Sequence, residues 1–199
     1  MEQTPFNQPE TPAPEANPPA KPNSMKQFVI EVVQTVVLAA VLYFLIDAVV
    51  ARVRVENISM EPTLMPGDFL LVNKLAYHFG TMQRGDIIVF HDPGDPSQDY
   101  IKRIIGLPGD NVQVQDGKVS VNNQVLTENY ISAPPDYQGA WTVPADSLFV
   151  LGDNRNSSSD SHSWGYVPES YVVGRAIFIY WPFNVVKALN RPVIVSATP

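Results

Sequence analysis

The stretch NVQVQDGKVSVN (residues 111–122) contains two runs of alternating apolar and polar residues, on either side of Asp116 and Gly117. Alternation with a period of two places every second side chain on the same face of a β-strand. An Asp-Gly pair between two such runs favours a two-residue hairpin turn, because both positions tolerate positive φ angles. These residues therefore predict a β-hairpin.

Similar short apolar runs occur on both sides of this hairpin, separated by Pro-Gly and Gly-Asp pairs that are typical of turns. They are DFLLVNK (68–74), DIIVF (86–90), YIKRIIG (100–106), SLFVLG (147–152) and GRAIFIYW (174–181). Many short strands at this spacing predict a mainly β domain over residues 53–199, an antiparallel β-barrel or a sandwich-like fold. The end of the chain, residues 185–199, reads as a short helix or an extended segment.

A different composition precedes this domain. Residues 28–50 contain no Gly or Pro and are apolar except for Glu31, Gln34, Thr35 and Asp47. Their central run VVLAAVLYFLI (36–46) is apolar on every face of a helix, which lipid requires and an amphipathic soluble helix avoids. As a helix, residues 32–50 span roughly 28 Å, close to the hydrocarbon thickness of a bilayer. A cleavable signal peptide and a buried soluble helix are the alternatives, but the small-residue cleavage site of a signal peptide is missing. We predict one transmembrane helix at 26–52.

The first residues of the chain form a third kind of segment. Residues 1–24 contain seven of the 19 prolines, and most of the other residues there are polar. This composition predicts a disordered Pro-rich tail, which we place at residues 1–25. Charge does not orient the predicted span, because Lys21 and Lys26 before it balance Arg52 and Arg54 after it.

The overall composition excludes several functions. The 13 basic and 20 acidic residues give a net charge of -7, which argues against a nucleic-acid partner. The chain has no cysteine, so disulfides, thiolate nucleophiles and thiolate metal ligands are all excluded.

Two polar segments contain candidate nucleophile and base residues. Ser59 lies in an irregular stretch, 57–64, soon after the predicted span, although most loop serines are only caps or turn residues. Lys102 and Arg103 are neighbours within the strand at 100–106, so one of them must point to the inner face. Such a residue either protects an edge strand from aggregation or is a buried lysine whose pKa is lowered, so that the neutral amine can act as a base.

The third polar segment is GDNRNSSSDSHSWG (152–165), which follows a predicted strand. A Ser-rich loop of this kind can be flexible. Its charged side chains, at Asp153, Arg155 and Asp160, instead favour an ordered loop held by hydrogen bonds.

Histidine chemistry is a rival interpretation. A Ser-His-Asp triad can combine Ser59 with His91 or His162. A metal site would need His91, Asp92, Asp95 or His162 to converge, yet no pair of histidines has metal-binding spacing. We therefore expect no metal and no organic cofactor.

Four blocks, taken in order behind an apolar helix, resemble the type I signal peptidases, which are membrane-anchored Ser/Lys endopeptidases. The blocks are SMEPTL (59–64) with GD (67–68); RGDIIVF (84–90); YIKR (100–103) with GLPGD (106–110); and GDNR (152–155) with Ser158, Asp160 and WG (164–165). The resemblance extends from the span to Phe183.

The resemblance implies a role for each matching residue. Ser59 corresponds to the nucleophile and Lys102 to the general base, a pairing that makes chemical sense because a serine hydroxyl needs a nearby base to become reactive. Ser158 corresponds to a serine that hydrogen-bonds and orients this lysine.

Further matches and two departures concern the surroundings of this pair. Asp153 and Arg103 correspond to a supporting ion pair, and Asp160 to a second structural acid. Asn57 stands where the family often has Ser or Gly; its amide N–H can help bind the oxyanion, or it can simply cap a turn. His162 stands where many relatives have Arg, so its ion pair with Asp160 is in doubt.

The resemblance implies an enzyme that removes signal peptides from preproteins after small-x-small sites, with its β domain outside the cytoplasm. The host is the cell membrane or a thylakoid-type membrane. An extended substrate would add to a strand edge, which we expect at residues 68–74. The alternatives are a Ser-His-Asp hydrolase that uses His162, a self-cleaving Ser/Lys regulator, and an inactive membrane-tethered β-domain that binds a partner.

Overall fold

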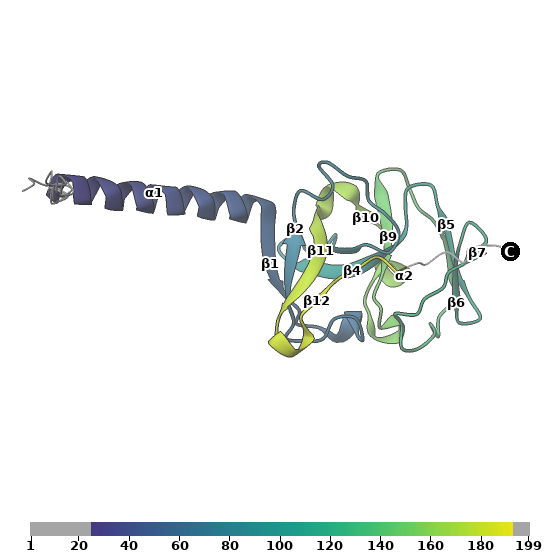
Figure 1. Cartoon of the computed structure of the whole chain (residues 1–199). Coiled ribbons are helices and arrows are strands. Elements are labelled where there is room, and N and C mark those ends of the chain that lie inside the picture. Colours follow the sequence, from purple (N-terminus) through teal and green to yellow (C-terminus); the bar gives the residue numbers. More distant parts are fainter. Residues whose placement is uncertain (1–24, 193–199) are drawn as a thin grey trace, which may run out of the picture. The chain divides into compact units, whose positions relative to one another are not determined.

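The structure is a computed structural model that describes residues 25–192 (Figure 1). The predicted Pro-rich tail, apart from Met25, and residues 193–199 lie outside the described residues. The chain divides into two compact units, 1–42 and 43–199.

The first described element is a long apolar helix, α1 (Met25–Val49). Its side chains are exposed along its whole length, and its most apolar 18-residue window has a mean hydropathy of 2.4. By length and composition it can cross a membrane. The helix ends at Val49, three residues before the end of the predicted span, because residues 50–52 belong to the strand β1 (Val50–Arg54).

A large antiparallel sheet forms one part of the β domain. Its spatial order is β1-β2-β11-β3-β4-β9-β10, with β12 paired to β11. These strands are β2 (Phe69–Asn73), β3 (Ile87–His91), β4 (Asp99–Gly106), β9 (Ser147–Leu151), β10 (Val167–Pro168), β11 (Val172–Trp181) and β12 (Lys187–Ala188).

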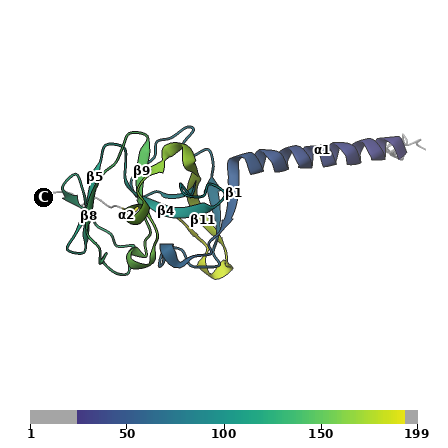
Figure 2. The same ribbon diagram turned by 180° about the vertical axis from the view of Figure 1, so that it is seen from behind.

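A second antiparallel sheet has the order β7-β6-β5-β8. Its strands are β5 (Asn111–Gln115), β6 (Lys118–Val121), β7 (Gln124–Val125) and β8 (Gly139–Thr142). The predicted hairpin is confirmed: β5 pairs with β6, and Asp116 and Gly117 have φ angles of 51° and 72°. Figure 1 shows β5, β6 and β7 together at the far end of the β domain from β1, and Figure 2 shows β8 beside β5.

The predicted fold class, mainly antiparallel β with an N-terminal apolar helix, is confirmed. Among the described strands, β1 and β10 end the large sheet and do not pair with each other, so the sandwich-like alternative applies and the barrel is not closed. All the strands predicted from alternating or apolar runs are present. Strands β1, β7, β8, β10 and β12 were not predicted.

The chain end between Val185 and Arg191 follows the extended alternative. After a single 3-10 turn, η4 (Phe183–Val185), the strand β12 pairs with β11. Other short 3-10 and α-helical turns lie between strands: η1 (Ile58–Met60), η2 (Arg155–Ser157), α2 (Ser161–Trp164) and η3 (Glu169–Tyr171).

The two sheets meet at the end of β4. Phe149 and Leu151 of β9 are fully buried in one cluster with Val112 and Val114 of β5. Gly106 lies at this junction, where a Cβ atom would come within 2.7 Å of the Val112 side chain. This close approach requires glycine, and it brings the second sheet against the strand that carries Lys102.

We expect the substitution Phe149→Ala to lower the free energy of unfolding by about 3–5 kcal/mol, because it leaves a cavity between the sheets. Urea unfolding of the detergent-solubilised protein measures this change. Val125→Ala is the matched control, since Val125 is 48% exposed, and should change stability by less than about 0.5 kcal/mol. Equal losses in the two variants would contradict this account of the core.

Candidate active site

Ser59 lies in the 3-10 turn η1, which directly follows β1 and is fixed from two sides. On the inner side, Met60 and Leu64 are buried in the core of the large sheet. On the other side, the backbone N–H of Asn154 donates to the Ser59 carbonyl at 3.0 Å, and its side-chain amide donates to the Ile58 carbonyl at 3.1 Å. The loop at 152–165 therefore holds the backbone of the serine in place.

Lys102 lies on β4 and its side chain reaches the serine. The Nζ atom donates to Ser59 Oγ at 2.9 Å and to the Ile101 carbonyl at 3.1 Å. The ring of Tyr100, on the same face of the strand, lies 5.3 Å from Nζ. Two residues 43 positions apart in sequence are thus in direct contact.

Burial controls the charge of this lysine. Lys102 is only 5% exposed, and the loss of hydration lowers its pKa from 10.5 to about 8. The negative charge of Asp160 opposes this shift and is the smaller influence. The neutral amine, the form that can accept a proton, is therefore accessible near neutral pH.

The other buried cations of the described chain differ from Lys102 in having carboxylate partners. Arg103 pairs with Asp153 through two hydrogen bonds of 2.8 and 2.6 Å. Arg155 pairs with Glu128 through two of 2.8 and 2.6 Å. None of the ion pairs among the described residues involves Lys102, so desolvation of its charge is opposed only by the smaller influence of Asp160.

The loop after β9 packs against both members of this pair. Gly152 is buried, and a Cβ atom there would lie 2.2 Å from Ser158 Oγ and 2.4 Å from the Ser59 carbonyl oxygen. Only glycine fits. Ser158 Oγ is itself buried and makes no hydrogen bond to any described residue, including Lys102.

Asp160 organises the same loop and is completely buried. It accepts hydrogen bonds from the backbone N–H of Gly152 at 2.9 Å and of His162 at 3.2 Å. Its Oδ1 atom also lies 2.6 Å from His162 Nδ1, and the imidazole stacks on Tyr137 with ring centroids 4.0 Å apart. The Asp160–His162 contact is present, with histidine in place of arginine.

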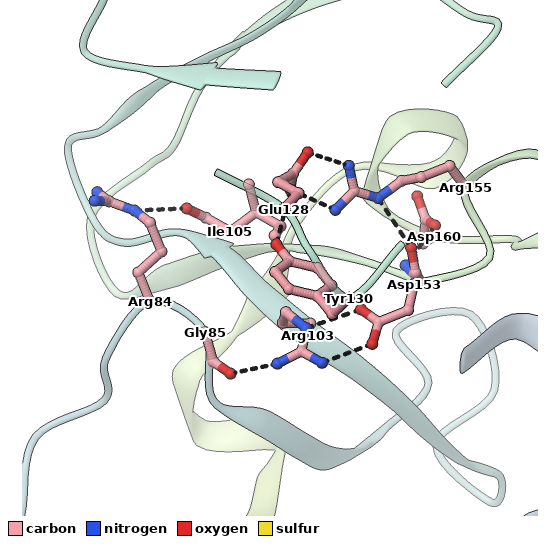
Figure 3. Close-up of polar contacts among 10 residues, drawn as sticks. Arg84, Gly85, Arg103, Ile105, Glu128, Tyr130, Asp153, Arg155 and Asp160 are labelled. Atoms are coloured by element: carbon pink, nitrogen blue, oxygen red, sulfur yellow. Dashed lines mark hydrogen bonds and ion pairs between the residues drawn. The ribbon is translucent and has the colours of Figure 1, made fainter. Parts of the chain in front are cut away.

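The ion pair between Arg103 and Asp153 joins β4 to the loop that begins after β9 (Figure 3). A third hydrogen bond, from Arg103 Nη1 to the Gly85 carbonyl at 2.8 Å, completes its coordination. Since Arg103 follows Lys102 in the strand, this ion pair fixes the backbone of β4 next to the lysine.

Two residues of this network, Glu128 and Tyr130, were not predicted from the sequence. Figure 3 shows the Tyr130 ring between Arg103 and Arg155. The centroid of this ring lies 4.1 Å from the Arg103 guanidinium carbon, and its hydroxyl donates to Glu128 at 2.7 Å. Arg155 in turn donates to the Gly152 carbonyl at 3.1 Å. Both missed residues lie in an irregular segment, where no periodicity marks a buried position.

Asn57 lies at the N-terminal end of η1 and is exposed. Its side chain makes no capping hydrogen bond, so the turn-capping alternative is wrong. It borders the same hollows as Ser59 and Lys102, and its amide is free to face a ligand there.

The histidines do not reach the serine. His91 pairs with Asp99 at 2.7 Å and is half exposed, whereas His162 is bound to Asp160. Among the residues described, the side chain that hydrogen-bonds Ser59 Oγ is that of Lys102. In the same part of the chain, no group of three His, Asp or Glu side chains can hold a metal ion.

A hollow of about 190 Å³ runs alongside the serine, between the segment at 53–60 and the first half of β4. The prediction that substrate adds to residues 68–74 is wrong, because β2 is paired on one side with β1 and on the other with β11. An edge without a partner strand is present in β4, which lines this hollow: among the described strands, residues 99–102 pair with β3 alone, since β9 joins only from Arg103 onward.

Comparison with known proteins gives consistent matches. The family model described as "Signal peptidase, peptidase S26" matches residues 29–181. A signal peptidase I from Leptolyngbya laminosa is 47% identical over 199 residues, covering 96% of this chain and 94% of the relative. A probable signal peptidase I-2 from Synechocystis sp. is 47% identical, covering 77% and 73%. A crystal structure of a signal peptidase I from Enterococcus faecalis V583 aligns with a TM-score of 0.45 and 33% identity, covering 48% of this chain and 97% of that one.

The β-rich fold, the site and these matches define a class: the protein is a serine endopeptidase, a hydrolase. Within that class the chain belongs to the signal peptidase family, peptidase S26, because the family model covers most of its length. The resemblance found from the sequence is thereby confirmed.

The lowered pKa of Lys102 makes the stability of the protein depend on pH. Between about 8 and 10.5, the lysine is still protonated in the unfolded chain but has lost its proton in the folded protein. The free energy of unfolding should therefore rise with pH across this window, by about 3 kcal/mol from Lys102 alone. Urea unfolding of wild type and of Lys102→Met at pH 7.5 and 10.5 isolates this contribution. An equal pH dependence in both proteins would contradict it.

Proposed function

We propose that the protein removes N-terminal signal peptides from preproteins, with Ser59 as nucleophile and Lys102 as general base. The observation that carries this proposal is the 2.9 Å hydrogen bond between the buried Lys102 Nζ and Ser59 Oγ. A base within hydrogen-bonding reach of a hydroxyl meets the geometric requirement for activating it.

In the first half of the reaction, the neutral amine of Lys102 accepts the Ser59 hydroxyl proton while Oγ attacks the scissile carbonyl carbon. The negative charge moves to the carbonyl oxygen. The backbone N–H of Ser59 and the side-chain amide of Asn57 are our candidates for stabilising it. The Lys102 ammonium then gives its proton to the leaving amine, and an acyl-enzyme ester on Ser59 remains.

In the second half, water replaces the amine. Lys102, neutral again, takes a proton from this water while the water oxygen attacks the ester. The Lys102 ammonium gives this proton to Ser59 Oγ as the ester bond breaks, and the signal peptide leaves with a new carboxylic acid, which loses its remaining proton to the solvent and becomes a carboxylate. The residues Ser158, Asp153, Arg103 and Asp160 act as positioning residues for this pair. The Arg103–Asp153 ion pair beside Lys102 supports this role for two of them, and the contacts of Gly152 with Asp160 and with Ser158 and Ser59 support it for the others.

The unpaired edge of β4 favours a substrate that binds as an added strand. Alternate side chains of an extended peptide point the same way, so the residues one and three positions before the cut would both face the 190 Å³ hollow. Its small volume and the walls formed by Val53, Val55 and Ile101 suit small apolar side chains. This supports cleavage after small-x-small sites.

The apolar helix α1 suits a single membrane anchor. We place the β domain on the extracytoplasmic side of the cell membrane or of a thylakoid-type membrane, where secreted preproteins emerge. The bilayer and preprotein signal peptides are then the partners.

Replacing either member of the pair should abolish processing. Without a nucleophile, Ser59→Ala should lose at least about 1,000-fold in kcat, and Lys102→Met should lose about 100- to 10,000-fold because the base is missing. Cleavage of a synthetic preprotein by purified enzyme in detergent measures both. Processing that survives in Ser59→Ala would remove Ser59 from the mechanism, whereas no processing by purified wild type would favour the binding-module alternative.

The histidine alternative makes the opposite prediction for two variants. A Ser-His-Asp hydrolase would retain activity in Lys102→Met and lose it in His162→Ala. We expect the reverse, with His162→Ala keeping measurable activity, because His162 contacts Asp160 and Tyr137 rather than Ser59.

The pH dependence of kcat/KM should follow the protonation of Lys102. With a pKa of about 8 for Lys102, only the minor neutral fraction is active at pH 7, so kcat/KM should rise about tenfold per pH unit below that value and level off above it. Initial rates between pH 6 and 10 test this. An inflection near 6.5, the ordinary histidine pKa, would instead point to an imidazole base.

A further inference from the structure

The hollow beside Ser59 is one of three that share the Tyr100 side chain as a wall. A second hollow, of about 290 Å³, extends across the serine to Ser157 and Ser159. A third, of about 370 Å³, continues beyond it and is lined by Asp92, Pro93, Gly94, Tyr100, Ser159 and Trp164. We call this third hollow the far pocket. A peptide that fills the first hollow and passes over Ser59 comes next to the far pocket.

The aromatic walls of the far pocket have a common support. Phe90 of β3 is fully buried. Its ring packs against Tyr100 at a centroid distance of 6.3 Å, and against Trp164 at the same distance. The pocket is therefore bordered by rings fixed to the sheet, and its volume lies in the range of sites that bind small ligands.

A single carboxylate, that of Asp92, lies in the wall of this pocket. Its carboxylate accepts a hydrogen bond from the Gly94 backbone N–H at 3.1 Å, which fixes its direction. Among the described residues no cation pairs with Asp92. The other acids of this loop are already engaged: Asp95 binds Ser97 and Gln98, and Asp99 binds His91.

We propose that the far pocket binds a Lys or Arg side chain of the substrate on the mature side of the scissile bond. This inference rests on the proposed function and adds a specificity determinant to it. A carboxylate without a partner, next to two aromatic rings, attracts a cation through charge and through the ring faces together. An acidic substrate side chain in the same place meets repulsion.

Cleavage of matched peptides tests the proposal. The peptides share one signal sequence and carry Lys, Glu or Ala at a single position, moved from two to five residues after the cut. With wild type, at one of these positions, kcat/KM should be roughly threefold to tenfold higher for Lys than for Glu. In Asp92→Asn this Lys-to-Glu ratio should fall close to one.

Asp95→Asn is the matched control, because it removes the same charge from the same loop outside the pocket. It should keep the wild-type ratio. If the Lys-to-Glu ratio falls equally in both variants, the preference comes from the negative charge of the loop as a whole, and the proposal is overturned. So would the absence of any preference in wild type, or a preference found only at positions before the cut.

Binding of the same peptides to Ser59→Ala separates the pocket from the chemistry. Fluorescence anisotropy of labelled peptides should give a lower Kd for Lys than for Glu, and Asp92→Asn in the Ser59→Ala background should abolish the difference. If wild type fails to cleave the Ala reference peptide while Ser59→Ala still binds the Lys peptide more tightly than the Glu peptide, the proposed function is wrong and the proposal for the far pocket is retained. Cleavage of the reference with equal Kd values overturns the pocket alone.

Discussion

The burial of one cation without a carboxylate partner is the constraint on which the site depends. A lysine buried among strands loses hydration, which destabilises its charged form. In the folded protein this loss lowers the pKa of Lys102. The neighbouring Arg103 has its charge balanced by Asp153. The contrast is functional, because the lysine without a carboxylate partner can release its proton and take up another.

The ordered network around the pair reaches both sheets. Arg103 lies in the large sheet, while Glu128 and Tyr130 lie in the segment that leaves the second sheet after β7. Arg155 connects them to the Gly152 carbonyl, at the start of the loop that holds the Ser59 backbone. The second sheet thus stabilises the site from a distance, although none of its strands contributes a residue that touches the serine.

Local patterns in the sequence predicted seven of the twelve described strands, and the family resemblance supplied the candidate pair, but neither located the edges of the sheet. Alternation located the hairpin at 111–122, since periodicity is a local property. Which strand has an open edge depends on pairing between distant segments, and for this reason β2 was chosen wrongly: β1, the segment VARVR directly after the helix, pairs with its edge. Glu128 was missed for a related reason, because its importance comes from Arg155, 27 residues later.

The open edge of β4 also has a consequence for inhibition. On the proposed mechanism, a competitive ligand needs an extended backbone that pairs with residues 99–102, and an electrophilic carbon placed over Ser59 Oγ. A boronic acid or a strained lactam supplies such a centre, since each forms a covalent adduct with an activated hydroxyl. Because the lysine that activates this hydroxyl is largely protonated below its pKa, compounds of this kind would react faster as the pH rises through about 8, whereas inhibitors of histidine-based proteases would show the same rise near the ordinary histidine pKa of about 6.5.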